Sequence, residues 1–161
     1  MKNKIIDIQK LAERGKELRA AGKKLVATNG CFDLLHLGHV RYLQAARALG
    51  DALVVGLNGD RSVRELKGPG RPINDEKTRA EMVAALECVD LVTIFAEMRA
   101  TQFLAAAVPG IYAKGGDYSS ETLNAEERAI LQKLAAEIRI IPFEKGYSTS
   151  GLLERLRGLA K

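Results

Sequence analysis

Short apolar runs alternate with amphipathic segments along the whole chain. The apolar runs have the length of buried strands, whereas the segments between them repeat apolar residues at the three- and four-residue spacing of helices. The predicted strands span residues 25–27, 52–57, 91–95, 111–113 and 138–142. The predicted helices span residues 8–20, 38–49, 61–66, 75–86, 99–107, 125–136 and 149–159.

This alternation predicts an α/β fold. A strand that is followed by a helix and then by another strand favours a parallel sheet with right-handed crossovers. We therefore expect a Rossmann-like, doubly wound sheet of five parallel strands with helices on both faces. Residues 1–161 fit one domain, with a leading helix in residues 1–22 packed on it. In such sheets ligands bind at the carboxyl ends of the strands.

The composition is that of an ordinary globular protein, with 47% hydrophobic and 28% charged residues. No apolar stretch approaches the roughly 20 residues that a membrane span needs, and the first residues lack the features of a signal peptide. We therefore expect a cytoplasmic protein without a membrane partner. The two cysteines, Cys31 and Cys88, belong to no CxxC pair, which argues against a disulfide framework or a structural zinc site.

The net charge of +5 suits a phosphate-rich ligand and would also suit a weak nucleic-acid binder. Lysine and arginine residues are interleaved with acidic residues on the amphipathic helices. Aromatic residues do not alternate with them to form a stacking platform. We therefore expect no nucleic-acid partner.

Both histidines of the chain, His36 and His39, stand where the first predicted strand gives way to a helix. The unpaired N–H groups and the positive dipole of a helix start favour an anion, and Gly38 would leave room for one between the imidazoles. Two ring N–H donors there would stabilise charge that develops on a phosphate. Two other interpretations stay open, a pair of surface histidines or a metal site with Asp33 as a third ligand.

The segment TNGCFDLLHLGHVRYL, residues 28–43, resembles the HxGH nucleotidyltransferases and in particular their cytidylyltransferase-like branch. The resemblance continues in order along the chain through RPIN at 71–74, Arg79, KGGDY at 114–118 and GYSTS at 146–150. Together these motifs most resemble the adenylyltransferases that activate D-glycero-D-manno-heptose 1-phosphate, which occur alone or fused to a sugar kinase. Only the transferase part is expected here.

The resemblance implies that the adenylyl group of ATP is transferred to the sugar 1-phosphate, giving ADP-heptose and pyrophosphate. Such a product would serve as a precursor of lipopolysaccharide or of another cell-surface glycan. Mg²⁺ would be carried by the triphosphate, with no protein ligand firmly assigned to it. Because relatives commonly dimerise, we expect a homodimer.

The segment KGPGRP, residues 67–72, is too rich in glycine and proline to be helical. We expect a mobile basic loop that closes over phosphates, with Lys67 neutralising the triphosphate. Arg71 would hold the phosphate of the acceptor, since a guanidinium matches two phosphate oxygens at once. The alternative is a solvated loop with two ordinary surface cations. Asn74 is predicted to be the N-cap of the helix that follows.

Residue chemistry and the resemblance together assign the candidate site. The catalytic candidates are His36, His39 and Lys67. The nucleotide-binding candidates are Asn29, Gly30, Phe32, Gly38, Arg79, Lys114, Gly115, Asp117, Ser148, Thr149 and Ser150. The acceptor-binding candidates are Asp33, Asn58 and Arg71.

Two rival functions stay open. The first is a cytidylyltransferase that acts on glycerol 3-phosphate or a similar small phosphorylated alcohol. KGGDY favours ATP and heptose instead, as does Phe143, which stands where the glycerol-phosphate enzymes tend to carry an arginine. The second rival is a non-catalytic nucleotide-binding module, which would need only affinity and not both histidines together with Lys67 and the hydroxyl residues 148–150.

Overall fold

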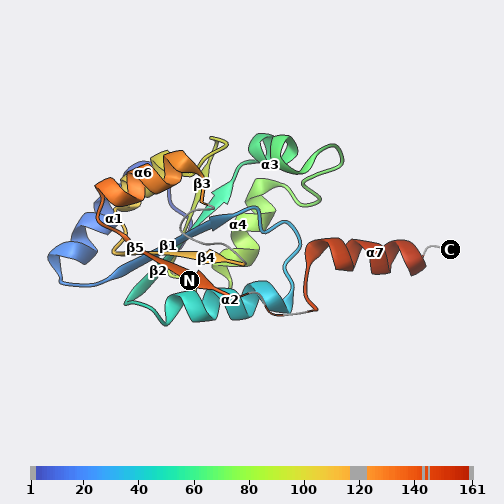
Figure 1. The fold of residues 1–161 in the computed structure, drawn as a ribbon, viewed down its shortest axis with the longest axis horizontal. Coiled ribbons are helices and arrows are strands. Elements are labelled where there is room, and N and C mark those ends of the chain that lie inside the picture. Colours follow the sequence, from blue (N-terminus) through green and yellow to red (C-terminus); the bar gives the residue numbers. More distant parts are fainter. Residues whose placement is uncertain (1–2, 117–122, 143, 145, 160–161) are drawn as a thin grey trace.

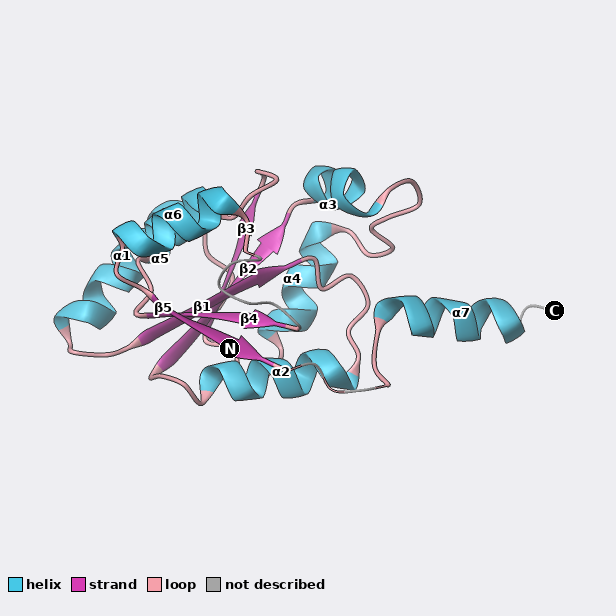
Figure 2. Ribbon diagram, viewed as in Figure 1, coloured by secondary structure: helices cyan, strands magenta, loops and turns pink. Residues whose placement is uncertain are grey.

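The computed structural model contains a five-stranded parallel sheet with helices packed on both of its faces (Figures 1 and 2). The structure describes residues 3–116, 123–142, 144 and 146–159. The strand order is β3-β2-β1-β4-β5, so the first strand lies at the centre. The predicted doubly wound α/β fold is confirmed. The strands are β1 (Leu25–Gly30), β2 (Ala52–Asn58), β3 (Leu91–Phe95), β4 (Ile111–Gly115) and β5 (Glu137–Ile141).

Every predicted helix is present, with small shifts at the ends. The helices are α1 (Ile8–Ala20), α2 (Leu37–Arg47), α3 (Asp60–Lys67), α4 (Glu76–Ala84), α5 (Thr101–Ala107), α6 (Ala125–Lys133) and α7 (Thr149–Leu159). The end of α6 comes earlier than predicted because Ala135 adopts a left-handed backbone conformation, with φ of +52°, which ends the helix.

β1 runs three residues beyond the predicted apolar core of the strand. Thr28, Asn29 and Gly30 are polar or small, yet they pair in register with Val55, Gly56 and Leu57 of β2. Backbone hydrogen bonding carries the strand where side-chain hydrophobicity does not predict it. The extension places Asn29 and Gly30 at the carboxyl edge of the sheet.

Successive residues of the central strands point to opposite faces of the sheet and so build two cores. On one face, Leu25 and Ala27 pack in a core to which α1, α5 and α6 also contribute. On the other face, Val26 packs with residues of α2 and α4. Figure 1 shows α1 and α6 on one side of the sheet and α2 on the other.

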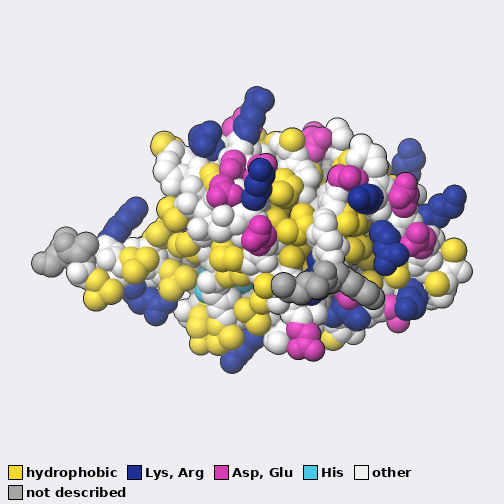
Figure 3. Space-filling view, turned by 180° about the vertical axis from the view of Figure 1, so that it is seen from behind, with side chains coloured by type: hydrophobic (Ala, Val, Ile, Leu, Met, Phe, Trp, Pro, Cys, Tyr) yellow, Lys and Arg dark blue, Asp and Glu magenta, His cyan; other side chains and the backbone are white. Residues whose placement is uncertain are grey.

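Helix α7 extends away from the sheet and buries none of its residues (Figure 1). Its apolar side chains are visible on the surface in Figure 3, and Leu159 is 82% exposed. Among the described residues, no helix has both the length and the apolar character that crossing a membrane would require.

We predict that Gly56→Ala lowers the free energy of unfolding by about 1–3 kcal/mol, because an added methyl group overpacks the core. A Cβ at Gly56 would lie 2.9 Å from the ring of Phe103, which is fully buried. Urea denaturation followed by circular dichroism measures the change.

Gly158→Ala is the matched control for that variant. Gly158 lies in α7, and a Cβ there would have no atom within 4 Å. Because alanine is the better helix former, this variant should be as stable as the parent or up to about 1 kcal/mol more stable. Equal denaturation midpoints for the two variants would contradict the overpacking of Phe103.

Candidate active site

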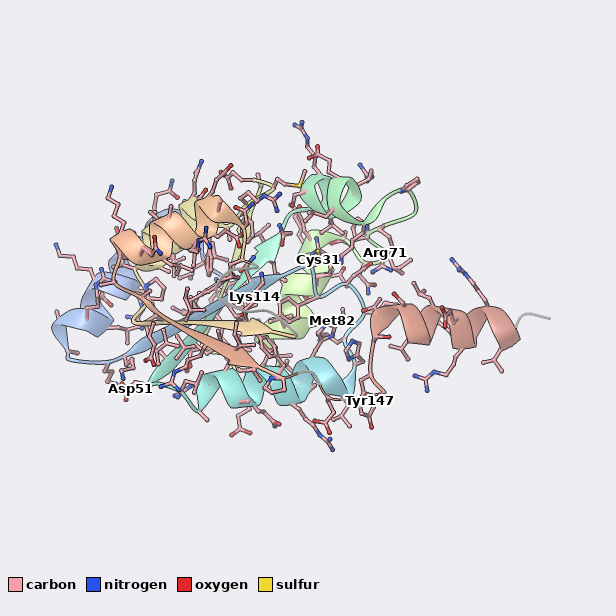
Figure 4. The ribbon with its side chains drawn as sticks, in the orientation of Figure 1. Cys31, Asp51, Arg71, Met82, Lys114 and Tyr147 are labelled. Atoms are coloured by element: carbon pink, nitrogen blue, oxygen red, sulfur yellow. The ribbon has the colours of Figure 1, made fainter. Side chains whose placement is uncertain are left out.

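A cavity of about 790 Å³ opens where β1, β2 and β4 end, within the roughly 300–1,000 Å³ that is usual for ligand pockets. Figure 4 shows Cys31, Arg71 and Lys114 toward this end of the sheet and Asp51 at the opposite end. Most of the predicted site residues line the cavity. These are Asn29, Gly30, Phe32, Asp33, His36, Gly38, His39, Asn58, Lys67, Arg71, Lys114, Gly115, Ser148, Thr149 and Ser150.

The two histidines form a stacked pair at the start of α2. His36 is the N-cap residue, and its Nδ1 accepts a hydrogen bond from the backbone N–H of His39 at 3.4 Å. The ring centroids lie 3.8 Å apart with an angle of 21° between the planes. Rings in van der Waals contact leave no room for an anion between them, so this part of the prediction is wrong. An anion can approach only at the ring edges and at the N–H groups of the helix start.

Both imidazoles are held in the neutral form. Burial, together with a smaller contribution from the neighbouring His36, lowers the pKa of His39 to about 4. Burial also lowers the pKa of His36. At neutral pH each ring therefore offers one N–H donor and one acceptor nitrogen rather than a positive charge.

Gly38 is required by its neighbours rather than by its own backbone angles. A Cβ at this position would lie 3.0 Å from Nδ1 of His36 and 3.0 Å from Cβ of Tyr147. The absent side chain thus admits the His36 ring and the segment before α7. The absence of a side chain at Gly38 thus lets the starts of α2 and α7 lie close together at one end of the cavity.

Phe32 turns the chain between β1 and the histidines. Its φ of +46° lies in the left-handed region, which costs a non-glycine residue about 1–3 kcal/mol. Its ring is buried 5.2 Å from the His39 ring and covers Gly30, where a Cβ would lie 2.9 Å from a ring atom. The side chain packs, and the main chain lies along the cavity.

Asp33 is engaged with protein donors. Its carboxylate accepts from Nε of Arg71 at 2.7 Å, from the N–H of Ile73 at 2.8 Å and from the N–H of Asn74 at 2.9 Å. The side chain is only 1% exposed. Asp33 was predicted to bind the acceptor. Its carboxylate oxygens instead hold the segment that precedes α4.

The N-cap of α4 is Asp75, and the prediction of Asn74 is wrong. The Asp75 carboxylate accepts from the N–H groups of Lys77 and Thr78, each at 2.9 Å. The side-chain amide of Asn74 instead donates to the carbonyl oxygen of Asp33 at 2.8 Å. A carboxylate one residue later reaches the same free N–H groups, and the helix accordingly begins at Glu76.

Arg79 does not line the cavity, although it was predicted to bind the nucleotide. Its side chain is 0% exposed. Its donors go to four protein oxygens on three segments, namely the carbonyls of Cys31 at 2.6 Å, Asn58 at 2.8 Å and Asn74 at 3.1 Å and the carboxylate of Asp60 at 2.8 Å. Arg79 therefore connects the ends of β1 and β2 with the starts of α3 and α4.

Two lysines enter the cavity from different elements. Lys67 is the last residue of α3 and is exposed. Lys114 lies near the end of β4, and burial lowers its pKa, opposed by the carboxylate of Glu127. Nζ of Lys114 lies 3.4 Å from the hydroxyl of Tyr112, which donates to Oδ1 of Asn29 at 2.5 Å. This polar chain crosses from β4 to β1 beneath the cavity.

Several lining residues were missed by the sequence analysis. They are Cys31, Tyr42, Leu66, Met98, Arg99, Leu123, Asn124, Glu127, Glu144 and Tyr147. Glu127 is buried, and its Oε1 accepts from the N–H of Ala100 at 3.1 Å. No feature of the neighbouring sequence distinguishes Glu127 from the exposed Glu126. Tyr147 could have been found, because it lies inside the GYSTS motif, residues 146–150. Asp117 and Phe143 lie outside the described residues.

The histidines and Asp33 do not converge on a metal. The rings are stacked, and the Asp33 carboxylate is occupied by Arg71 and two amides. Within the described part of the chain, no group of three or more His, Cys, Asp or Glu residues is arranged to hold a metal ion. The geometry favours phosphate binding over the metal interpretation.

Comparison with known proteins agrees with this geometry. The family model described as "Cytidylyltransferase-like" matches residues 27–155. The chain is 48% identical over 138 residues to the "Bifunctional protein HldE" of Trichlorobacter lovleyi and 49% identical over 154 residues to that of Helicobacter pylori strain J99. These matches cover 86% and 96% of this chain but only 28% and 31% of those proteins.

One solved structure is similar in both sequence and fold. It is the lipopolysaccharide core biosynthesis protein of Thermoplasma volcanium GSS1, with 30% identity and a TM-score of 0.64. The match covers 79% of this chain and 100% of that one.

We predict that both imidazoles titrate below the ordinary histidine pKa. NMR of the ring protons should place the pKa of His39 near 4, mainly because of its burial. In His36→Asn the pKa of His39 should rise, because the charge of His36 contributes to the shift. It should not return to 6.5, because burial is the larger cause.

The same shift has a consequence for stability. Because the pKa of His39 is lower in the folded protein, the unfolded chain takes up this proton first as the pH falls. The contribution of His39 to stability is therefore present above about pH 6.5 and is lost between about pH 6.5 and pH 4. A pKa of His39 near 6.5 in the parent protein would contradict its desolvation.

Proposed function

The chain belongs to the cytidylyltransferase-like family of nucleotidyltransferases, and from this premise we propose that it transfers the adenylyl group of ATP to D-glycero-D-manno-heptose 1-phosphate. One observation carries the proposal. A single cavity is lined by groups suited to a triphosphate, at the starts of α2 and α7 and at Lys67, and by a separate guanidinium, that of Arg71, suited to the phosphate of an acceptor. A reaction between a nucleoside triphosphate and a phosphorylated acceptor needs both.

The starts of α2 and α7 suit the triphosphate. The starts of α2 and α7 line the same cavity together with His36 and His39, and the unpaired N–H groups of a helix start favour an anion. Ser148, Thr149 and Ser150 add hydroxyls there, and Oγ of Ser148 accepts from the N–H of Gly151 at 3.0 Å. Lys67 adds a positive charge from the end of α3.

The chemistry requires no base. An oxygen of the sugar 1-phosphate, already ionised at neutral pH, attacks the α-phosphorus of ATP in line. The new oxygen–phosphorus bond forms as the bond to the bridging oxygen of pyrophosphate breaks, and pyrophosphate leaves with the electron pair. The N–H donors of His36 and His39 stabilise the charge on the transferring group, so catalysis rests on position and electrostatics.

Mg²⁺ is proposed to enter with the triphosphate and to neutralise part of its charge. The carboxylate in the histidine motif, that of Asp33, is committed to Arg71 and two amides, which fits a metal carried by the substrate. The expected homodimer, the cytoplasmic location and the mobility of the 67–72 loop stay predictions.

Heptose as the acceptor is supported by the motifs and by the relatives. KGGDY and GYSTS resemble those of the heptose 1-phosphate adenylyltransferases. The solved relative from Thermoplasma volcanium is described as a lipopolysaccharide core biosynthesis protein, and the curated relatives are named HldE. A cytidylyltransferase for glycerol 3-phosphate is the second candidate, because it would use the same phosphate-binding groups with another base pocket.

We predict that pyrophosphate is released fastest with ATP and D-glycero-D-manno-heptose 1-phosphate together. The assay combines ATP or CTP with heptose 1-phosphate or glycerol 3-phosphate and compares the four values of kcat/KM. A higher value for CTP with glycerol 3-phosphate would support the second candidate. No release with any pair would overturn both.

We predict that His36→Ala and His39→Ala each lower kcat about a hundredfold or more, as expected for the loss of a preorganised donor to developing charge. The Kd of ATP, measured by calorimetry, should change much less. His36→Asn removes the imidazole but keeps the helix cap, because asparagine also caps helices well. If His36→Asn turned over at the parent rate, the imidazole of His36 would not be needed for catalysis.

A further inference from the structure

Asp33 joins two loops that are far apart in the sequence. Its carboxylate and carbonyl bind Arg71, Ile73 and Asn74, a set that we call the Asp33 junction. The junction attaches the segment before α4 directly to the loop that carries the histidine motif. With a side chain 1% exposed, Asp33 is poorly placed to bind a ligand itself, and its effect on a ligand must pass through the residues that it holds.

Arg71 lines the cavity together with Asp33 and is the more exposed of the two side chains. Its Nε donates to Asp33 at 2.7 Å, and its side chain is 17% exposed. Within the described residues, no hydrogen bond or ion pair engages its two terminal nitrogens. A guanidinium that is held at Nε presents its Nη edge, and this edge matches two oxygens of a phosphate.

On the basis of the proposed function, we propose that Asp33 is a positioning residue that directs the Nη edge of Arg71 toward the phosphate of the sugar phosphate acceptor. The junction contributes specificity for a phosphorylated acceptor. It does not take part in the transfer step.

The chemistry of the junction requires a carboxylate at position 33. All the groups that face the side chain are donors, namely Nε of Arg71 and the N–H groups of Ile73 and Asn74. A carboxylate offers only acceptors, whereas an asparagine would direct an NH₂ group at one of these donors. Asparagine has nearly the same shape, so Asp33→Asn changes mainly this pairing.

Lys67 is independent of the junction. Gly68 and Gly70 have φ values of +88° and +79°, so the chain turns between α3 and Arg71. The junction holds only the Arg71 end of this turn. Loss of the junction should therefore weaken binding of the acceptor phosphate and leave the contribution of Lys67 to the triphosphate in place.

Asp33→Asn tests the proposal through two readouts. Hydrogen exchange at the amides of Ile73 and Asn74 should become faster, because both lose their carboxylate acceptor. The KM of the acceptor should rise about tenfold or more, as expected for the loss of one charge-assisted hydrogen bond, whereas kcat and the KM of ATP should change much less. Faster exchange with an unchanged acceptor KM would overturn the proposal.

Asp75→Asn is the matched control. It makes the same substitution in the same loop, two residues beyond Ile73, and asparagine is accepted as an N-cap. Exchange at Ile73 and the acceptor KM should both stay at the parent values. Equal effects of Asp75→Asn and Asp33→Asn would show that the loop responds to any lost carboxylate, which contradicts a specific junction.

A double variant tests whether Asp33 acts through Arg71. The acceptor KM of Asp33→Asn/Arg71→Ala should be no higher than that of Arg71→Ala alone. Additive effects would overturn the proposal. If Asp33→Asn does not fold, Arg71→Lys serves instead, because lysine keeps the charge but lacks the Nε and Nη edges. Its acceptor KM should rise, and an unchanged value would contradict the proposal.

These readouts separate the junction from the proposed function. If the parent protein released no pyrophosphate with any substrate pair, the proposed function would fail. The junction would still be tested by exchange at Ile73 and Asn74 and by titration with inorganic phosphate. Phosphate should bind more weakly to Asp33→Asn than to the parent, and equal binding would overturn the positioning role.

Discussion

The loops around the cavity depend on one buried guanidinium. Arg79 binds carbonyl oxygens at Cys31, Asn58 and Asn74 and the carboxylate of Asp60. A buried arginine is tolerated only when its donors are paired, so the three segments that carry these four acceptors must take up the positions that satisfy it. The acceptors lie at the ends of two neighbouring strands and at the starts of two helices. One side chain that does not itself line the cavity thereby sets the spacing between the histidine loop and the basic loop.

The cavity separates neutral donors from positive charges. The imidazoles of His36 and His39 stay neutral because burial lowers the pKa of each, and they share their end of the cavity with the N–H groups of two helix starts. Lys67, at the end of α3, and Arg71, in the loop that follows, supply positive charge to the same cavity. Charged residues bind a polyphosphate strongly in the ground state. Neutral donors in a partly buried position gain more as negative charge builds, which is what a transfer step requires.

The sequence predicted what is local and missed what depends on distant partners. The histidine motif, its helix and the hydroxyl residues at the start of α7 were found because their chemistry is contained in a few adjacent positions. Asp33 and Arg79 were also recognised, but as ligand contacts. Their partners stand 38 and 48 residues away, at Arg71 and Cys31, and only the sheet order brings them together. Glu127 had no signal at all, since an acidic residue in the first turn of a helix is usually a solvated one.

The left-handed backbone at Phe32 shows why the histidine loop tolerates strain. A glycine at this position would relieve the φ of +46°, but it would remove the ring that covers Gly30 and lies 5.2 Å from His39. The turn at Phe32 also lies directly before Asp33, whose carboxylate must face Arg71 while the chain continues toward His36. The backbone cost of about 1–3 kcal/mol is thus offset by packing and by the bonds of the Asp33 junction. The strain persists because the same short loop must place a histidine pair on one side and a carboxylate on the other.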